Sequence, residues 1–307
     1  MSTILITGGT GLVGKTLTAL LIAKNHQVII LTRSIPKVEA NEHVTYAVWD
    51  VKKNTIDINA IKEADAIIHL AGAGVMDKKW DDAYKKEIVD SRIKSSLLLV
   101  KALKENTNKV KTIVSSSAIG WYGGDKIENH FFTEDEPADA QFLGVTCKAW
   151  EDSIGTASAL GIRVCKLRTG IVLSKAGGAY KEFRKTLAFG IASILGNGKQ
   201  MVSWIHIDDL CNQFLFALEN ENIVGSYNAV APMPVSNKVL TLAIAKVLCP
   251  KFYIQAYVPT FILKIMLGER SVEILKSATV SSKKMEVAGF QFLFPTAEMA
   301  IKNLENK

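Results

Sequence analysis

The chain has 307 residues, of which 48% are hydrophobic and 22% are charged, and its formal charge is +7. These values are typical of a soluble globular protein, long enough for one large α/β domain and a smaller lobe. Lys and Arg are spread along the chain without a basic run or a basic–aromatic cluster, which argues against nucleic-acid binding.

The cysteines and the apolar segments indicate the cellular location of the protein. The four cysteines, Cys147, Cys165, Cys211 and Cys249, are far apart and form no CxxC pair. They predict reduced thiols in a cytoplasmic protein, with no disulfide framework and no metal site. The N-terminal apolar run is too short for a signal peptide, and the late apolar segment 261–267 is too short to span a bilayer. We therefore expect no membrane partner.

The first elements surround a glycine-rich turn. Residues 4–6 predict a buried strand, and the leucines between 17 and 21 predict a helix. Gly8 suits the tight turn, Gly11 leaves room for a phosphate, and Gly14 lets the helix pack on the strand. The free N–H groups of such a helix attract an anion. The pattern indicates dinucleotide binding, with a plain glycine loop as the alternative.

Residues 26–34 predict a second strand that ends in a polar turn. In a dinucleotide fold this turn lies beside the adenosine ribose, where a carboxylate favours NAD. The chain has Arg33 and Ser34 here and no carboxylate. Because a guanidinium suits a 2′-phosphate, the turn favours NADP(H). The alternative is that Arg33 is a solvated loop cation.

A later strand and the helix that follows it are expected to complete the cofactor side. Residues 66–74 form an apolar run that ends in small residues, which leave room for a cofactor, and His69 inside it is expected to be a core histidine. A long helix over 81–105 places Arg92 toward the sheet, four residues after Ile88. Arg92 is therefore expected to contact either a phosphate or a structural carboxylate.

The substrate side is expected at the end of a strand over 110–114, where a serine-rich turn follows. A hydroxyl there is placed to hydrogen-bond a substrate carbonyl or alcohol. We expect an α/β fold: a Rossmann-type doubly wound parallel sheet with a smaller C-terminal α+β substrate lobe. We expect residues 1–172 to form the NADP-binding Rossmann domain and residues 173–307 to form mainly the lobe. Within the second range, residues from about 203 to 230 are expected to pack back onto the Rossmann domain.

The motif TGGTGLVG at 7–14 resembles the TGxxGxxG signature of extended short-chain dehydrogenases/reductases. More narrowly, the chain resembles the atypical branch of epimerase-family proteins, NAD(P)-dependent epimerase/dehydratase-like and sometimes described as cell-division inhibitors. The matching stretches are HLAG at 69–72, KW at 79–80, DSR at 90–92, SAIGWYG at 117–123, RTGIVL at 168–173, SWIHIDD at 203–209, YNA at 227–229 and AGFQF at 288–292.

The resemblance implies NADP(H) binding, with Arg33 and Ser34 on the 2′-phosphate and Leu70 and Ala71 on the adenosine side. Glu87 is a cofactor contact implied by the branch alone. No metal is expected. The complete set of expected cofactor contacts is Thr7, Gly8, Thr10, Gly11, Leu12, Val13, Arg33, Ser34, Leu70, Ala71, Gly72, Glu87, Arg92, Ser115, Arg168, Gly170 and Val172.

The chain departs from the wider superfamily at its catalytic pair. Active members carry a Tyr four residues before a Lys, because hydride transfer at a carbonyl requires a proton at its oxygen. Here Lys148 is present, but Gly144 stands where the Tyr is expected. Ser117 matches the substrate-polarising serine, and Tyr122 either supplies a hydroxyl or packs as an aromatic ring.

Two functions follow from the resemblance. The first is an NADP(H)-dependent oxidoreductase or epimerase-like enzyme that acts on a small carbonyl or sugar-like substrate. The second is a catalytically silent NADP(H)-binding regulatory or sensor protein, which the replacement of the Tyr by Gly144 favours. The sequence leaves the identity of the substrate and the oligomeric state open.

Overall fold

The apolar run near the N-terminus forms β1 (Thr3–Thr7), which pairs in parallel with β2 (Gln27–Thr32) and β5 (Ala66–His69). Alternate side chains of β1 enter opposite cores: Ile4 lies in one and Leu5 in the other. Both faces of the strand are therefore buried, which explains why its sequence is apolar without a polar alternation. The computed structural model describes residues 1–36, 42–125 and 130–306.

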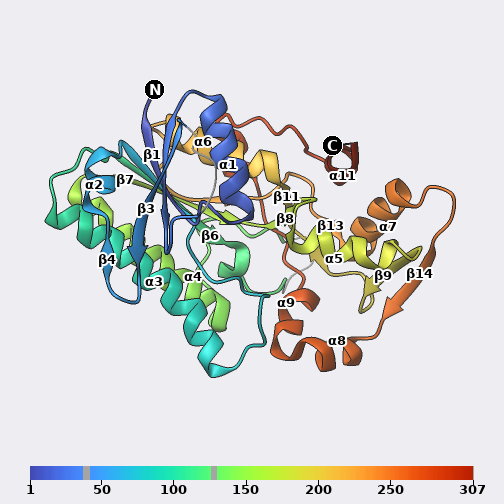
Figure 1. Ribbon diagram of the computed structural model, residues 1–307. Coiled ribbons are helices and arrows are strands. Elements are labelled where there is room, and N and C mark those ends of the chain that lie inside the picture. Colours follow the sequence, from blue (N-terminus) through green and yellow to red (C-terminus); the bar gives the residue numbers. More distant parts are fainter. Residues whose placement is uncertain (37–41, 126–129, 307) are drawn as a thin grey trace.

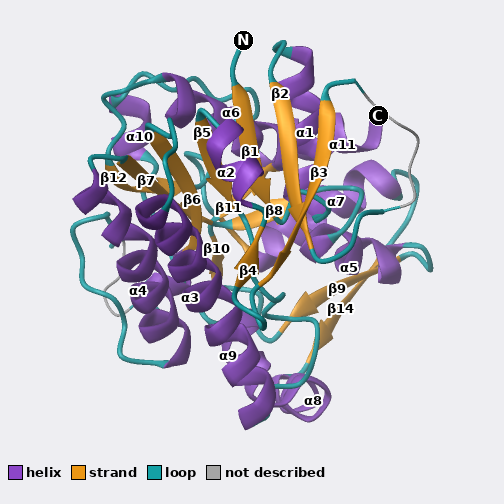
Figure 2. Ribbon diagram, turned by 60° about the vertical axis from the view of Figure 1, so that its left-hand side comes forward, coloured by secondary structure: helices purple, strands orange, loops and turns teal. Residues whose placement is uncertain are grey.

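The main sheet has eight strands in the order β12-β7-β6-β5-β1-β2-β3-β4. All neighbours pair in parallel except β4, which pairs antiparallel with β3 (Figure 2). The remaining strands of this sheet are β3 (Val44–Asp50), β4 (Thr55–Ile56), β6 (Thr112–Ala118), β7 (Arg163–Thr169) and β12 (Gly225–Ala229). The strand order reverses beside β1, and ligands of such sheets bind at the carboxyl ends next to this point.

Helices cover both faces of the sheet. One face packs on α1 (Leu12–Ala23) and α6 (Ile207–Glu219). The other packs on α2 (Ile58–Glu63), α3 (Asp82–Glu105) and α4 (Phe142–Gly155), of which α3 and α4 lie side by side in Figure 2. Short 3-10 turns follow at η1 (Ile119–Trp121) and η2 (Thr156–Leu160). The expected doubly wound α/β fold is confirmed.

The C-terminal half supplies a smaller lobe, at the right in Figure 1. Its centre is a two-stranded parallel sheet of β9 and β14, and two further strand pairs, β8–β11 and β10–β13, lie between it and the main sheet. These strands are β8 (Ile171–Leu173), β9 (Ile191–Leu195), β10 (Met201–Val202), β11 (Trp204–His206), β13 (Val235–Ser236) and β14 (Ile254–Val258). The helices of this half are α5 (Gly178–Leu187), α7 (Asn237–Leu248), α8 (Thr260–Leu267), η3 (Gly268–Arg270), α9 (Ser271–Leu275) and α11 (Ala297–Asn306), together with α10 (Lys283–Val287), which lies beside β12 of the main sheet (Figure 2).

Hydrogen bonds hold the lobe over the carboxyl ends of β5 and β6. Asp125, just after η1, accepts from the Ser277 hydroxyl at 2.7 Å and from the Thr279 N–H at 2.8 Å. Arg270 Nη1 donates to the Met76 carbonyl at 2.8 Å, between η3 and the loop after β5. The lobe thus lies beside the crevice outside the carboxyl ends of the strands, where ligands of open parallel sheets bind. Within the described ranges no helix has both the length and the apolarity needed to cross a membrane.

Candidate functional site

The turn between β1 and α1 brings bare backbone to the edge of the sheet. Gly8 has a φ of 72°, and a Cβ there would lie 3.0 Å from the Leu70 carbonyl. A Cβ at Gly14 would overlap the Gly8 carbonyl oxygen, so α1 packs directly on the turn. Gly11 is the N-cap and offers no side-chain acceptor. Within the part of the chain that the structure describes, no side chain caps the start of α1, which leaves this helix end suited to an anion.

The other expected residues of the turn lie around this helix end. Thr10 is exposed beside Gly11, and Leu12 and Val13 are half-buried in the first turn of α1. Positions for a Cβ on Gly177 and Gly178 lie 3.6 Å from the Leu12 side chain. The start of the lobe therefore packs against the start of α1.

A buried network fixes the ends of β1 and β5. The Thr7 hydroxyl accepts the N–H groups of Leu70 and Ala71 at 3.1 Å each, and it therefore donates its own proton to His69 Nδ1 at 2.7 Å. His69 Nε2 then carries the hydrogen and lies 3.1 Å from the Ser96 hydroxyl. Burial lowers the pKa of His69 to about 3, so the ring is neutral. Thr7 and His69 thereby fix the positions of Leu70 and Ala71.

Arg33 and Ser34 are exposed directly after β2, at the same edge of the sheet. The Thr32 hydroxyl donates to the Ser34 carbonyl at 3.0 Å and shapes this turn. Among the residues that the structure describes, no carboxylate forms an ion pair with Arg33. Its guanidinium is available to an anion from solvent.

Arg92 lies behind Gly72, on the helix that follows β5. Its Nη1 donates to the carbonyls of Ala73 at 3.0 Å and Ile88 at 2.9 Å, and its guanidinium lies over the Trp150 ring at 5.0 Å. A Cβ on Gly72 would lie 3.2 Å from Arg92 Cζ. Burial lowers the pKa of Arg92, and no carboxylate of the described part of the chain pairs with it. A positive charge without a protein counter-ion therefore lies under the crevice.

Glu87 lies on the same helix, but on its exposed face. Its carboxylate is 52% exposed and lies 3.2 Å from the Lys78 ammonium. This ion pair does not test the cofactor contact of Glu87 that the resemblance implies. That contact stays a prediction.

The serines at the end of β6 are turned into the protein. Ser115 is buried and donates to the Ser116 carbonyl at 3.0 Å. Ser117 is 2% exposed and donates its hydroxyl proton to Glu151 Oε1 at 2.7 Å. In this arrangement the Ser117 oxygen has only lone pairs left for a substrate, whereas polarising a substrate carbonyl requires a donor.

Arg168 was expected on the cofactor, and the structure places it inside the protein instead. Its Nε and Nη2 donate to the two carboxylate oxygens of Glu151 at 2.8 and 3.1 Å. Its Nη1 donates to the Tyr122 hydroxyl at 3.0 Å and to the Glu134 carbonyl at 3.1 Å. Because Arg168 is 3% exposed and all three guanidinium nitrogens are engaged, it supports the walls of the crevice from below.

Tyr122 belongs to the same network. Its hydroxyl donates to Asn228 Oδ1 at 2.7 Å, accepts from Arg168 and is buried, and its ring stacks on Phe132. Burial raises the pKa of Tyr122 to about 12. The sequence left two roles open for Tyr122, a hydroxyl donor and a packed aromatic ring. These contacts favour the packed ring.

The expected catalytic lysine lies on the outer face of α4. Lys148 is 59% exposed and forms an ion pair with Asp152 at 2.6 Å. The pair that faces the end of β6 is Leu143 and Cys147, because a Cβ on Gly120 would lie 3.3 Å from Leu143 Cβ and 3.5 Å from Cys147 Sγ. The residues of α4 that face Gly120 are therefore each one position earlier than Gly144 and Lys148, the positions that the motif spacing predicts.

Gly144 supports this shift of one residue. It is buried in α4, and a Cβ there would overlap the Asp139 carbonyl oxygen. In this packing the position has no room for any side chain, a phenol included. The buried thiol of Cys147 faces Gly120, and burial raises its pKa to about 12, so the thiol is neutral.

Gly170 and Val172 lie farther along the same edge. Gly170 donates its N–H to the Ala229 carbonyl at 3.0 Å, and a Cβ there would lie 2.6 Å from the Ser203 carbonyl oxygen. Val172 is half-buried in β8, opposite Ile205 of β11. Both residues help to close the sheet side of the crevice.

Sequence reasoning missed the residues that hold this site together. They are Glu134, Leu143, Cys147, Glu151 and Asn228. A helical wheel of α4 separates Leu143, Cys147 and Glu151 from Lys148 and Asp152, and would have placed Lys148 on the outside. Glu134 approaches from a distant segment and leaves no local signal, whereas Asn228 lies in the YNA stretch at 227–229, which gave no role for it.

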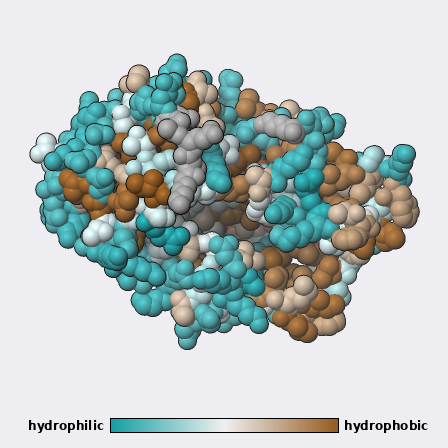
Figure 3. Space-filling view, in the orientation of Figure 1, coloured by the Kyte–Doolittle hydropathy of each residue, from teal (hydrophilic) through white to brown (hydrophobic). Residues whose placement is uncertain are grey.

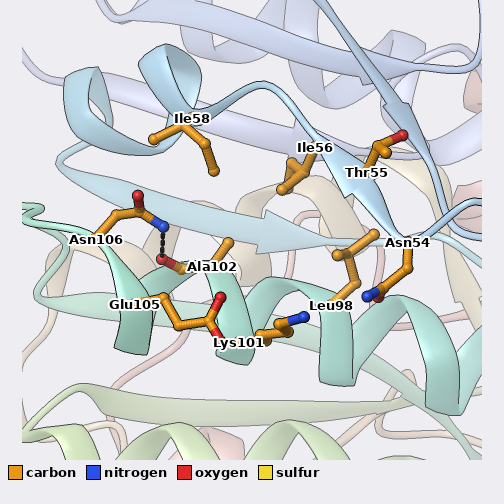
Figure 4. Close-up of a pocket in the computed structure, with 9 residues that line it drawn as sticks. All are labelled: Asn54, Thr55, Ile56, Ile58, Leu98, Lys101, Ala102, Glu105 and Asn106. Carbon is orange, nitrogen blue, oxygen red and sulfur yellow. Dashed lines mark hydrogen bonds between the residues drawn. The ribbon is translucent and has the colours of Figure 1, made fainter.

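A separate hollow of about 200 Å³ lies between β4 and α3, and it contains none of the expected site residues. Figure 4 shows Ile56 and Ile58 above Leu98 and Ala102, with Lys101 and Glu105 at the rim. The Asn106 amide donates to the Ala102 carbonyl there at 2.9 Å, which is a cap of α3. The hollow lies where the end of α3 packs on β4, and its contacts are those of a helix terminus.

A sequence profile described as the NAD dependent epimerase/dehydratase family matches residues 4–230. The chain belongs to this family. A second profile, a domain of unknown function (DUF1731), matches residues 258–304, so the profile of the epimerase family ends before α8.

Relatives of the epimerase family match along the whole chain. An epimerase family protein of Mycobacterium bovis is 32% identical over 94% of this chain and 92% of its own length. One of Staphylococcus aureus strain MRSA252 is also 32% identical and covers 100% of both chains. The epimerase family protein YfhF of Bacillus subtilis is 32% identical over 98% of this chain and 97% of its own length.

Two solved structures share this architecture. Human epimerase family protein SDR39U1 (isoform 2), solved with NADPH, superposes with a TM-score of 0.85 at 26% identity, over 99% of this chain and all of that chain (100%). The nucleoside-diphosphate sugar epimerase of Corynebacterium glutamicum has a TM-score of 0.78 at 31% identity and covers 100% of this chain and 59% of its own.

Proposed function

We propose that this chain is an NADP(H)-binding, epimerase-like oxidoreductase that acts on a small carbonyl or sugar-like substrate. The observation that carries the proposal is the N-terminus of α1, where no side chain of the described residues caps the helix and Gly8 packs directly on the backbone of Leu70 and Ala71. Family membership and the human relative solved with NADPH support it.

The residues of the chain fit such a cofactor. Gly8 and Gly11 leave the backbone open where a pyrophosphate would lie against α1, and Arg92 offers a positive charge without a protein counter-ion beside Gly72. Arg33 and Ser34 would hold the 2′-phosphate, since both are exposed and no carboxylate competes for the guanidinium in the described residues. This is the reason to propose NADP(H) rather than NAD(H).

The substrate would lie at the end of β6, between Ser117, Gly120 and the lobe. When bound there, a nicotinamide supplies hydride transfer. The residues of the chain would orient the substrate and exclude water: Ser117 as a hydrogen-bond acceptor, because its proton is held by Glu151, and Cys147 as a neutral thiol beside Gly120. An acceptor at Ser117 suits a substrate that presents a hydroxyl group, such as an alcohol or a sugar.

A second function has its own supporting observation. The hydroxyl protons of Ser117 and Tyr122 are held by protein acceptors, and the Lys148 ammonium is held by Asp152 on the far side of α4. A protein without a free proton donor at the expected places would bind NADP(H) as a regulatory or sensor protein, without turnover.

Two measurements test these functions in turn. Fluorescence titration of the purified chain should give tight NADPH binding and weaker NADH binding, and a chain that binds neither would refute both functions. Incubation with NADPH and a panel of small carbonyls, or with NADP⁺ and sugar nucleotides, then separates them. Turnover that falls in Ser117→Ala, which removes the hydroxyl proposed to face the substrate, supports the enzyme. Tight binding without turnover supports the sensor.

A further inference from the structure

The outer part of the lobe has an unusual charge pattern. Between Glu221 and Glu269 the chain contains no Asp or Glu, although it contains four lysines. This carboxylate-free stretch forms α7, β14 and α8, which make the outer edge of the lobe in Figure 1. The edge is therefore basic along its length. The lysines are Lys238, Lys246, Lys251 and Lys264.

Large apolar side chains protrude from the same edge. Phe189 is 84% exposed and Phe252 is 74% exposed, and they lie close together because the Ile254 N–H donates to the Gly190 carbonyl at 2.9 Å. Figure 3 shows apolar surface over β14 and, at the lower right, over α8. We call this surface the lobe ridge. Its residues are Phe189, Phe252, Ile254, Tyr257, Phe261, Ile265 and Met266, each at least half exposed.

A basic cavity opens beside Phe189. It has a volume of about 510 Å³, and Lys181, Arg184 and Lys185 line it above an apolar floor that includes Leu187. Glu182 pairs with Lys185 at 2.7 Å, and a second carboxylate, Glu305, pairs with the guanidinium at 3.1 Å. Lys181 has no ion-pair partner among the described residues. The cavity therefore keeps a positive charge next to the protruding phenylalanines.

We propose that the lobe ridge docks on the surface of an anionic phospholipid bilayer. The phenylalanines would enter the boundary between headgroups and acyl chains, while the lysines and the basic cavity contact headgroup phosphates. The expectation that the chain has no membrane partner was based on the absence of a spanning segment, and peripheral docking needs none. This inference does not depend on cofactor binding.

Charge and shape favour a bilayer over a second copy of the chain. Two copies that met through the same ridge would bring the same lysines together, which costs binding energy. The apolar side chains also protrude singly along a ridge, whereas protein interfaces pack densely against a complementary surface. A fluid bilayer accommodates separate protruding side chains.

Vesicle flotation of the full chain tests the proposal. Vesicles of phosphatidylcholine mixed with phosphatidylglycerol should carry the chain upward, and vesicles of phosphatidylcholine alone should not. Binding should fall as salt rises, because the charges at the surface are screened. The double variant Phe189→Ser, Phe252→Ser should lower the partition coefficient by about tenfold or more. Lys181→Glu with Lys251→Glu should lower it by about fivefold for each lysine removed.

Matched controls on the sheet domain keep the test specific. Leu97→Ser changes a 48% exposed apolar residue on α3, and Lys62→Glu changes an exposed lysine on α2. Both should float like the wild type, and all variants should keep the melting temperature and the NADPH affinity of the wild type. Absent or charge-independent flotation, or equal losses in ridge and control variants, would overturn the proposal.

Two further outcomes would give this surface a function other than binding to a bilayer. If light scattering shows a dimer that the phenylalanine variant converts to a monomer, the ridge is an interface between two copies. If inorganic phosphate at low concentration abolishes flotation at constant ionic strength, the cavity is a site for a soluble anion. Either result would overturn the docking on a bilayer.

Discussion

The guanidinium of Arg168 and the carboxylate of Glu151 form a doubly hydrogen-bonded ion pair in the interior, with N–O distances of 2.8 and 3.1 Å. The two side chains are 3% and 4% exposed. The same carboxylate accepts the hydroxyl of Ser117 from β6 and that of Ser226 from β12. One ion pair therefore connects α4 with three strands below the substrate side of the crevice.

Removing either partner of this pair should destabilise the fold strongly, because it leaves a buried charge without a counter-ion. We expect Glu151→Leu and Arg168→Met each to lower the free energy of unfolding by about 3–5 kcal/mol. The double variant should lose clearly less than the sum of the two. Urea denaturation of the four proteins measures this coupling. Additive losses would contradict it.

The ion pair between Lys148 and Asp152 provides the matched control, since both side chains are more than half exposed, at 59% and 62%. Lys148→Ala should change the free energy of unfolding by no more than about 0.5 kcal/mol. It should also leave NADPH affinity unchanged. A large loss of turnover in this variant alone would return Lys148 to the site.

Substitutions at two glycines of the first turn should affect different properties, Gly14 the stability of the fold and Gly11 the affinity for the cofactor. Gly14→Ala places a methyl group on the Gly8 carbonyl, so it should lower the free energy of unfolding by about 1–3 kcal/mol. At Gly11 the nearest atom to the added methyl is the Gly8 carbonyl oxygen at 3.3 Å. Gly11→Ala should therefore cost less than about 1 kcal/mol.

The cofactor affinity of Gly11→Ala should nevertheless fall by about tenfold or more, because the methyl group points to where the phosphates approach. Thermal melting and NADPH titration of the two variants measure both effects. If Gly11→Ala bound NADPH as tightly as the wild type, the pyrophosphate would not lie at this helix end.

Arg33 should set the preference between the two cofactors. A charge-assisted hydrogen bond to the 2′-phosphate contributes about 1.5–3 kcal/mol. Arg33→Ala should therefore weaken NADPH binding by about tenfold to a hundredfold and leave NADH binding unchanged. Lys24→Ala, which removes an exposed cation at the far end of α1, should change neither affinity. Equal losses for NADPH and NADH in Arg33→Ala would argue against a 2′-phosphate contact.

The parts of the fold that the sequence predicts are those encoded locally. An apolar run, a glycine turn and a periodic helix identify β1 and α1, because each depends on neighbours in sequence. The spacing of a motif is a weaker guide to the direction in which a side chain points. Lys148 has the spacing of a catalytic lysine, yet the period of α4 turns it to solvent and turns Cys147 inward.

Long-range polar contacts account for the rest. The sequence predicts that Arg168 contacts the cofactor. In the structure its guanidinium binds Glu151 of α4 and Tyr122 of the turn after β6. Such pairs are set by how the elements pack, and a single sequence carries no pattern for them.

The thiols should differ in reactivity according to burial. Burial raises the pKa of Cys147, Cys165 and Cys211 to about 12 each, so their thiolate fraction at pH 8 is about one in ten thousand. Cys249 is less buried. Iodoacetamide should label Cys249 first in the native protein and all four cysteines after denaturation, as read by peptide mass spectrometry. Rapid native labelling of Cys147 would show that its thiol is activated.

His69 should make the fold sensitive to mild acid. Burial lowers its pKa from 6.5 to about 3, so between these values the unfolded chain binds a proton that the folded chain does not. The contribution of His69 to stability is complete above pH 6.5 and decreases as the pH falls toward 3. By pH 5 the loss from this group should reach about 2 kcal/mol.

Urea denaturation at pH 7.5 and at about pH 5 measures this effect. His69→Asn should be less stable than the wild type at the higher pH, since it disturbs the contacts to Thr7 and Ser96, and its stability should fall less on acidification. His43→Asn, which changes a histidine with a side chain 38% exposed, should keep the acid sensitivity of the wild type. If His69→Asn and the wild type lost the same free energy between the two pH values, His69 would not be the group that titrates on unfolding.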